Sequence, residues 1–349
     1  MDNPKYVPPK YQITDKLLNL IVEGEKMLSD IRHADLSTVS KGKLIDVALV
    51  ENLHYFSQVI NMPITRGEAK RISVGKIPVG KEYKVVANYR SAMEYIRNVC
   101  NTGIGEFNYA EIMHLNKLLG AGVGDEWDLG RIRTPGDSIN ETYEPFPPKK
   151  IDALLVSKTI PELLFYLDKN VNVHPLIRGV VLLSDLIQLY PFTYLNAATV
   201  FASFELFLNV KDVGGDGLVP IWSSVAEDTN AFFAYYKDII STGKAIDALL
   251  ELIVVGWHRA VEGVRREAVK MSYNEEIKGR AKFLNLNHRQ LSTLRHLQTH
   301  IKITRREYMS LFRVSTMTGY RDLTDMVEKK LLMVNGHGRG VYYVLVTKA

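Results

Sequence analysis

The sequence has little or nothing of several features that define whole classes of protein. One cysteine, Cys100, among 349 residues provides neither an internal disulfide nor a cysteine-based zinc site. No apolar run approaches the roughly 18 to 20 residues of a membrane helix, and the opening MDNPKYVPPK lacks the apolar segment of a secretory signal. With 13 prolines, 24 glycines and 46% hydrophobic residues, the composition is neither disordered nor fibrous. These absences predict a soluble, globular, cytoplasmic protein with more than one domain.

Charge is divided unevenly along the chain. The whole sequence has 44 basic and 39 acidic residues, a net charge of +5. Residues 278–349 contain 14 Lys and Arg against four acids, whereas residues 1–277 contain 30 against 35. A basic module attached to a mildly acidic body favours contact with a nucleic acid over a merely solvated basic surface.

The spacing of apolar residues predicts a mainly α chain, with helical periodicity almost throughout residues 1–277. The pattern weakens between 127 and 148, where the turn Pro135-Gly136 predicts a short β-hairpin flap or an irregular loop. We therefore expect three parts: an N-terminal helical segment over 1–80, a helical core over 81–277 that carries the flap, and a separate module over 278–349. The helices expected before the flap cover 16–31, 43 to about 60 and 81–100, followed by one with Asn108 as its N-cap.

The module predicts three short helices followed by a β-hairpin. A helix over 288–300 precedes a capping box formed by Thr304 and Glu307, and Ser315 caps a third helix. Two β-rich runs then surround the turn 335–340, which contains three glycines. This is the order of a winged helix-turn-helix, an α+β module whose third helix enters the major groove of duplex DNA. The alternative use of such a module is contact with a protein.

The expected DNA contacts follow from that order. The start of the third helix would face base edges, the arginines around the turn would bind phosphates, and the hairpin tip would reach a phosphate or the minor groove. The base-edge residues are Thr316, Met317, Thr318, Tyr320 and Arg321, the phosphate-binding residues are Arg305, Arg306 and Arg313, and the tip residue is Arg339.

Two segments near the centre of the chain carry a family resemblance. HPLIR at 174–178 precedes a long apolar helix, and YPFTYLNAA follows at 190–198. With KVVANYRSAMEYI, GRIRT at 130–134 and YEPFPPKKIDALL, these segments resemble the Fic family over most of the chain. The resemblance implies a helical Fic-type body with a flap, and a C-terminal winged helix is a known addition to it. Most members of the family transfer AMP from ATP to a hydroxyl side chain of another protein.

The family motif reads H-P-F-x-(D/E)-G-N-(G/K)-R-x-x-R and implies a role for each position. Its His is a general base, its acid holds Mg²⁺ on the phosphates, its glycines admit the phosphates to backbone N–H groups, and its arginines neutralise phosphate charge. Only Pro191, Phe192 and Asn196 match here. Tyr190 replaces the His, Tyr194 the acid, Leu195 and Ala197 the glycines, and Ala198 and Phe201 the arginines.

These replacements predict a degenerate site with no catalytic residue. Tyrosine has an ordinary pKa near 10 and is a poor base at neutral pH. Many family members also carry an inhibitory S/T-x-x-x-E motif, and the segment that resembles it runs from Ser57 to Asn61, with Asn in place of Glu. The histidines show no metal-ligand spacing with acids or Cys; His296 and His300, four residues apart, are interpreted as surface or DNA-facing.

The leading hypothesis is a Fic-fold pseudoenzyme that acts as a DNA-binding transcriptional regulator. We expect duplex DNA as a partner, a homodimer, no membrane association, no cofactor and no metal, with a protein partner or small ligand at the helical body. One alternative is a protein adenylyltransferase that uses ATP and Mg²⁺ at an altered site; another is a protein-interaction scaffold. AMP transfer that depends on Tyr190 or Asn196 would support the enzyme.

Overall fold

The computed structural model describes residues 6–77, 80–102, 106–142, 144–145, 151–242 and 246–346. Clustering of contacts divides the chain into two compact units. The first takes in residues up to Ala34 together with Lys41–Ala268, and the second takes in Asp35–Ser40 together with the chain from Val269 onward. None of the described helices is long and apolar enough to cross a membrane.

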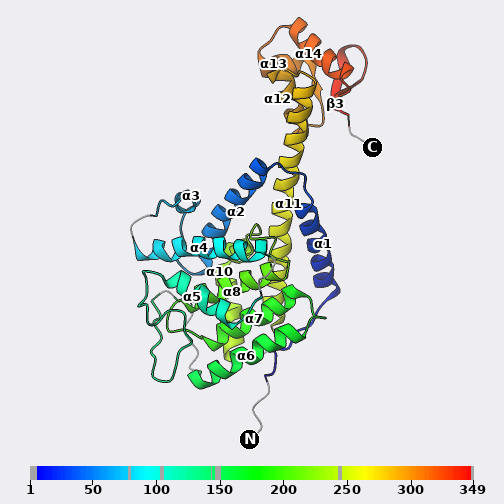
Figure 1. The fold of residues 1–349 in the computed structure, drawn as a ribbon. Helices are drawn as coiled ribbons and strands as arrows, with labels where there is room; N and C mark the ends of the chain where they lie inside the picture. The colour runs from blue at the N-terminus through cyan, green and yellow to red at the C-terminus, as the bar shows by residue number, and fades with distance from the viewer. Residues whose placement is uncertain are drawn as a thin grey trace. The chain divides into compact units, whose positions relative to one another are not determined.

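The first unit is built from helices, as the apolar spacing predicted (Figure 1). Asn108 is the N-cap expected for the fifth helix, because its side chain accepts the N–H groups of Ala110 and Glu111. The helices are α1 (Asp15–Arg32), α2 (Thr38–Val59), α3 (Arg66–Ser73), α4 (Lys81–Thr102), α5 (Tyr109–Gly120), α6 (Ala153–Lys169), α7 (Pro175–Leu189), α8 (Asn196–Val210), α9 (Ser223–Glu227), α10 (Thr229–Thr242) and α11 (Asp247–Phe283). The expected boundary at residue 278 lies inside α11, which continues from the first unit into the second.

The core of the first unit surrounds α8. Every residue of this helix from Asn196 to Asn209 is buried, and it packs against α4, α5 and α7. A helix that is buried on all sides lies at the centre of its bundle. Gly179 of α7 allows the close approach of the two helices, since a Cβ there would lie 2.9 Å from atoms of Phe204 and Leu208.

The sequence of the flap allowed either a short β-hairpin or an irregular loop, and its described residues form an irregular loop. The described residues between α5 and α6 form turns and bends, and no strand. Side chains hold the segment: Arg131 pairs with Asp128 at 2.8 Å and with Asp137 at 2.6 Å, and Asp137 also accepts the Thr134 N–H. These bonds hold the described part of the flap as a loop. Residues 143 and 146–150 of this segment lie outside the description.

The second unit contains the expected helices and hairpin, plus one further strand. Its elements are α12 (His288–Thr299), β1 (Ile303–Thr304), α13 (Arg305–Phe312), α14 (Thr316–Glu328), β2 (Leu332–Asn335), the 3₁₀ turn η1 (Gly338–Gly340) and β3 (Tyr342–Leu345). The strands form an antiparallel sheet in the order β1-β3-β2, with Tyr343 of β3 paired to Ile303 on one side and to Val334 on the other. The sheet therefore joins the segment before α13 to the hairpin after α14.

A buried carboxylate ties the helices of the second unit together. Asp322 of α14 accepts hydrogen bonds from Asn287 Nδ2 at 2.9 Å, Arg289 Nε at 2.8 Å and the Tyr308 hydroxyl at 2.8 Å. Burial opposes its charge, but these bonds hold the pKa of Asp322 below its ordinary value. The unit also has a hydrophobic core of its own, formed by Leu294, Leu297, Ile303, Tyr308, Leu323, Met326, Leu331, Leu332 and Tyr343.

Candidate functional site

The loop between α7 and α8 has a fixed conformation. Tyr190 and Leu195 lie at its two ends in the left-handed region, with φ of 50° and 55°. Asn196 closes the loop, because its Oδ1 accepts the Phe192 N–H at 2.7 Å and its Nδ2 donates to the Phe192 carbonyl at 2.9 Å. The flap reinforces it through the Arg133 N–H, which donates to the Pro191 carbonyl at 2.9 Å. Asn196 therefore has a clear structural role in this loop.

A carboxylate of the flap occupies the N-terminus of α8. The N–H groups of Asn196 and Ala197 donate to Glu144 Oε1 at 2.6 Å and Oε2 at 3.0 Å. Tyr190 hydrogen-bonds the same carboxyl group. A helix N-terminus attracts anions because its first N–H groups lack partners within the helix. In this chain, an internal side chain satisfies the N–H groups to which a ligand anion would bind.

The ionisation of this cluster is shifted by its surroundings. Burial raises the pKa of Glu144 to about 7, although the two backbone N–H groups favour its charged form. Burial and the Glu144 charge raise the pKa of Tyr190 above that of an ordinary tyrosine. Because Tyr190 keeps its proton, the residue at the His position of the motif is unsuited to act as a general base.

The other degenerate positions are packed into the core. Leu195, Ala197, Ala198 and Phe201 are all buried. The Phe201 ring lies 4.6 Å from the Trp222 ring, centroid to centroid, so an aromatic contact stands at the position of a motif arginine. Tyr194 is half-buried and Phe192 buried.

The described residues include no group of three or more His, Cys, Asp or Glu side chains that would hold a metal ion. The rings of His296 and His300 stack with centroids 3.9 Å apart. Burial, together with the neighbouring His300, lowers the pKa of His296. Ser57 is buried and braces the end of α2, since its Oγ donates to the His54 carbonyl at 2.6 Å and accepts the Ile64 N–H at 3.1 Å. Asn61 is exposed just beyond α2, with a left-handed φ of 58°.

The start of α14 presents an exposed face. Thr316, Met317, Tyr320 and Arg321 are all exposed, and their spacing places them on one side of the helix. Met317 and Tyr320 retain 60% and 48% of their surface, although apolar and aromatic side chains favour burial. Thr318 is half-buried and donates its N–H to Ser315 Oγ, which confirms Ser315 as the N-cap.

Arginines surround this face. The Arg305 guanidinium lies 5.3 Å from the centroid of the Tyr320 ring, and Arg306 is exposed at the start of α13. Arg313 is exposed between α13 and α14 with a φ of 50°. Within the described part of the chain, no residue forms an ion pair with Arg306, Arg313 or Arg321.

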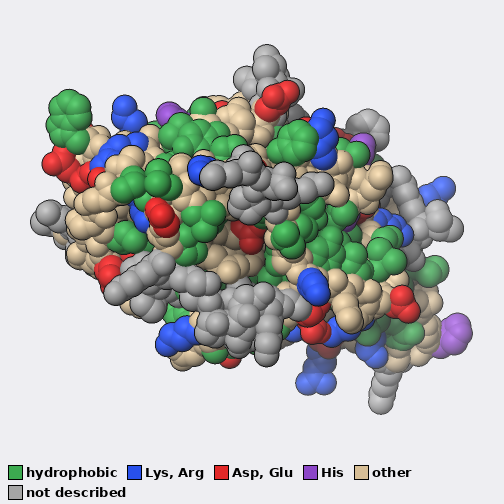
Figure 2. Space-filling model, turned by 90° about the horizontal axis from the view of Figure 1, so that it is seen from below, with side chains coloured by type: hydrophobic (Ala, Val, Ile, Leu, Met, Phe, Trp, Pro, Cys, Tyr) green, Lys and Arg blue, Asp and Glu red, His purple; other side chains and the backbone are tan. Residues whose placement is uncertain are grey.

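Three of the four acids of this region are engaged by other groups, and the fourth, Glu328, is exposed at the end of α14. Glu307 accepts the Thr304 N–H at 2.7 Å in the expected capping box, Asp322 pairs with Arg289, and Asp325 pairs with Lys329 at 2.7 Å. None of the three partnered acids forms an ion pair with Arg306, Arg313 or Arg321. By contrast, basic and acidic side chains are interspersed among apolar ones on the face that Figure 2 shows.

Arg339 belongs to the β2–β3 tip, where η1 spans Gly338–Gly340, and its side chain lies outside the description. The tip depends on glycine, because Gly336 has a φ of 83° and a Cβ there would clash with the Gly340 carbonyl. The structure thus brings the predicted residues of α13 and α14 together and places Arg339 in the expected turn.

Comparison with solved structures identifies the fold. A Fic family protein from Desulfovibrio desulfuricans G20 superposes with a TM-score of 0.60 at 19% identity, over 99% of each chain. A Fic domain containing signaling protein from Bacteroides thetaiotaomicron gives 0.52 at 13% identity, over 74% of this chain and 98% of that one. Fic-1 from C. elegans gives 0.54 at 14% identity, over 73% and 71%. The protein therefore has the Fic fold. Its sequence matches no protein-family model and no curated protein.

Proposed function

We propose that this protein is a DNA-binding regulator in which a Fic-fold body without catalytic groups is joined to a winged helix-turn-helix. The observation that carries the proposal is the exposed face of α14, surrounded by arginines that have no acidic partner among the described residues. The order α12, β1, α13, α14, β2, β3 supports it, because this arrangement exposes the third helix for insertion into a groove.

Each exposed residue has a chemical role in this proposal. Arg321 donates to base edges, with guanine O6 and N7 as the favoured acceptors, and Met317 contacts thymine methyl groups. Arg306 and Arg313, at the two ends of α13, bind phosphates and set the register. Arg305 is positioned by stacking on Tyr320 and supports the same surface.

The helical body would serve regulation and assembly. Glu144 occupies the N–H groups at the start of α8, and Tyr190 and Phe201 replace a base and an arginine of the Fic motif, which supports a pseudoenzyme. A homodimer would place two copies of α14 on paired half-sites, as winged helices often do. We place this regulator in the cytoplasm.

Fluorescence anisotropy with a labelled duplex tests the proposal. Arg321→Ala in the full chain should weaken binding about tenfold or more, because a base-edge contact contributes on the order of 1–3 kcal/mol. Arg259→Ala is the matched control, since Arg259 is an exposed arginine of the first unit. Equal affinity of the two variants would refute the groove assignment. Displacement of the labelled duplex by polyglutamate as effective as displacement by unlabelled duplex would indicate an acidic protein partner instead.

A further inference from the structure

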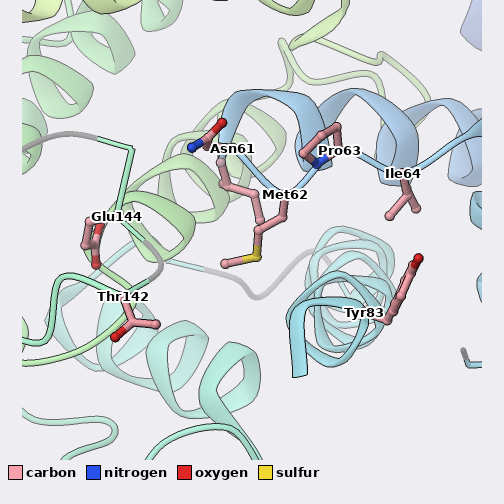
Figure 3. Close-up of a pocket in the computed structure, with 8 residues that line it drawn as sticks. Asn61, Met62, Pro63, Ile64, Tyr83, Thr142 and Glu144 are labelled. Carbon is pink, nitrogen blue, oxygen red and sulfur yellow. The ribbon is translucent and has the colours of Figure 1, made fainter. Parts of the chain in front are cut away.

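A cavity of about 340 Å³ lies beside Glu144 (Figure 3). Its walls come from residues 60–64 after α2, from Tyr83 of α4, and from Thr142 and Glu144 of the flap. The volume falls within the range of roughly 300–1,000 Å³ typical of small-molecule sites. It is about twice that of an engineered cavity that binds benzene, roughly 150 Å³.

The apolar wall is held in place by a dense set of hydrogen bonds. Ser57 fixes both sides of the turn, because its carbonyl accepts the Met62 N–H at 2.8 Å and its Oγ accepts the Ile64 N–H at 3.1 Å. His54 Nδ1 lies 2.8 Å from the Ile64 carbonyl, and the Tyr83 hydroxyl donates to Glu68 at 3.1 Å. The cavity is therefore formed before any ligand arrives, which lowers the entropic cost of binding.

The two ends of the cavity differ in chemistry. Met62 and Ile64 are buried residues on the apolar side, and Figure 3 shows the Met62 side chain extending between Tyr83 and the flap residues. Glu144 and Thr142 of the flap form the polar side, and the exposed Asn61 adds an amide to the lining. Such a cavity suits a ligand with an apolar body and one polar group.

The carboxyl group of Glu144 favours a ligand whose polar group is positively charged. A carboxylate oxygen offers two lone pairs, and each Glu144 oxygen accepts one backbone N–H from α8. The Tyr190 and Asn196 side chains also hydrogen-bond this carboxyl group, so what Glu144 offers a ligand in the cavity is its negative charge. Because burial raises the pKa of Glu144 to about 7, a phosphate or carboxylate ligand would meet its negative charge above that pH and would find the α8 N–H groups already engaged.

We infer that this cavity binds a small amphiphilic amine, with its ammonium group on Glu144 and its apolar body against Met62, Ile64 and Tyr83. The inference goes beyond the proposed regulator function and does not depend on DNA binding. It assigns the helical body a ligand class distinct from nucleotides.

Three probes of similar size test the charge preference in the full chain without DNA. Titration calorimetry with 2-phenylethylamine, 2-phenylethanol and 3-phenylpropionate should show the amine binding at least about tenfold more tightly than the alcohol, with no detectable binding of the acid. Equal binding of the three probes would overturn the inference, as would binding of none.

Matched variants then locate the contact. Glu144→Gln should reduce amine affinity to that of the alcohol and leave the alcohol unchanged, whereas Glu141→Gln, an exposed acid of the same flap outside the cavity lining, should alter neither. Thr142→Trp should block all three probes by filling the cavity, which gives a second test if Glu144→Gln folds poorly. A tenfold preference for the amine that survives in folded Glu144→Gln, or amine binding unaffected by Thr142→Trp, would refute the site.

Discussion

The N-termini of α8 and α14 make opposite use of the same physical property. Both helices begin with N–H groups that favour an anion. At α8 an internal carboxylate, Glu144, takes two of these groups, and Phe201 fills the place of a neighbouring arginine. At α14 the N-cap Ser315 satisfies one N–H group, and the arginines nearby remain exposed. The two helix starts therefore differ in the charge of the internal group that caps them and in whether the neighbouring position carries an exposed arginine or a buried phenylalanine.

Introducing an arginine at Phe201 of α8 or at Met317 of α14 should give the largest difference in stability between the two regions. Phe201→Arg places an uncompensated charge in an aromatic core and should destabilise the first unit by about 4 kcal/mol or more. Met317→Arg, on the exposed face of α14, should change stability by less than about 0.5 kcal/mol and should strengthen duplex binding.

Urea denaturation of the full chain measures both effects. Because the two units have separate cores, the loss in Phe201→Arg should appear in the transition of the first unit. A loss of stability below about 1 kcal/mol for Phe201→Arg would show that this position, where the Fic motif has an arginine, accepts a charge. That result would contradict the conclusion that the degenerate motif is packed into the core.

The two units should also respond in opposite directions to pH. Burial raises the pKa of Glu205 in α8 from 4.5 to about 8, partly offset by hydrogen bonds from Tyr89 and Trp222. Its contribution to stability is complete below pH 4.5 and is lost as the pH rises through about 8. Asp322 in the second unit has a lowered pKa, so its contribution is complete above the ordinary value of 3.8 and is lost as the pH falls through the folded-state value.

Thermal denaturation across this pH range provides the measurement. Glu205→Gln should flatten the alkaline loss in the first unit, and Asp322→Asn should flatten the acid loss in the second. Each variant should leave the other unit unchanged. Parallel pH profiles for the two units in the unmodified chain would contradict the assignment.

Features with local causes were predictable from the sequence. The N-caps Asn108, Thr304 and Ser315 were found because a cap needs only its own first turn. The Fic fold was anticipated from segments that resemble the family over most of the chain. The exposed start of α14 was anticipated from the order of three helices and a hairpin, although Thr318 of the predicted set is half-buried.

Features that depend on tertiary placement were missed. Glu144 lies 52 residues before its partner Asn196, and only the folded path of the flap brings the two together. No pattern in the sequence around Glu144 indicated this contact. Strand β1 was missed because two residues carry no period, and α3 because its pattern covers eight residues. The described part of the flap contains no strand, and the Arg131–Asp137 pair helps to hold it as a loop.

A smaller effect compares the two capping boxes, one in each unit. Thr65 reciprocates hydrogen bonds with Glu68 at the start of α3, as Thr304 does with Glu307 at the start of α13. Thr65→Ala and Thr304→Ala should each cost about 1 kcal/mol, in the first and second unit respectively. Only Thr304→Ala should also weaken duplex binding. Weaker binding in Thr65→Ala but not in Thr304→Ala would show that the second unit does not bind the duplex.

The salt dependence of duplex binding tests the central claim most directly. For the full chain, the logarithm of the affinity should fall linearly with the logarithm of the salt concentration, with a slope of about −0.9 per phosphate contact. The double variant Arg306→Ala with Arg313→Ala should reduce the slope by about two units, because each arginine is assigned one phosphate. An affinity independent of salt, or a slope that the double variant leaves unchanged, would contradict the assignment of the α13–α14 surface to DNA.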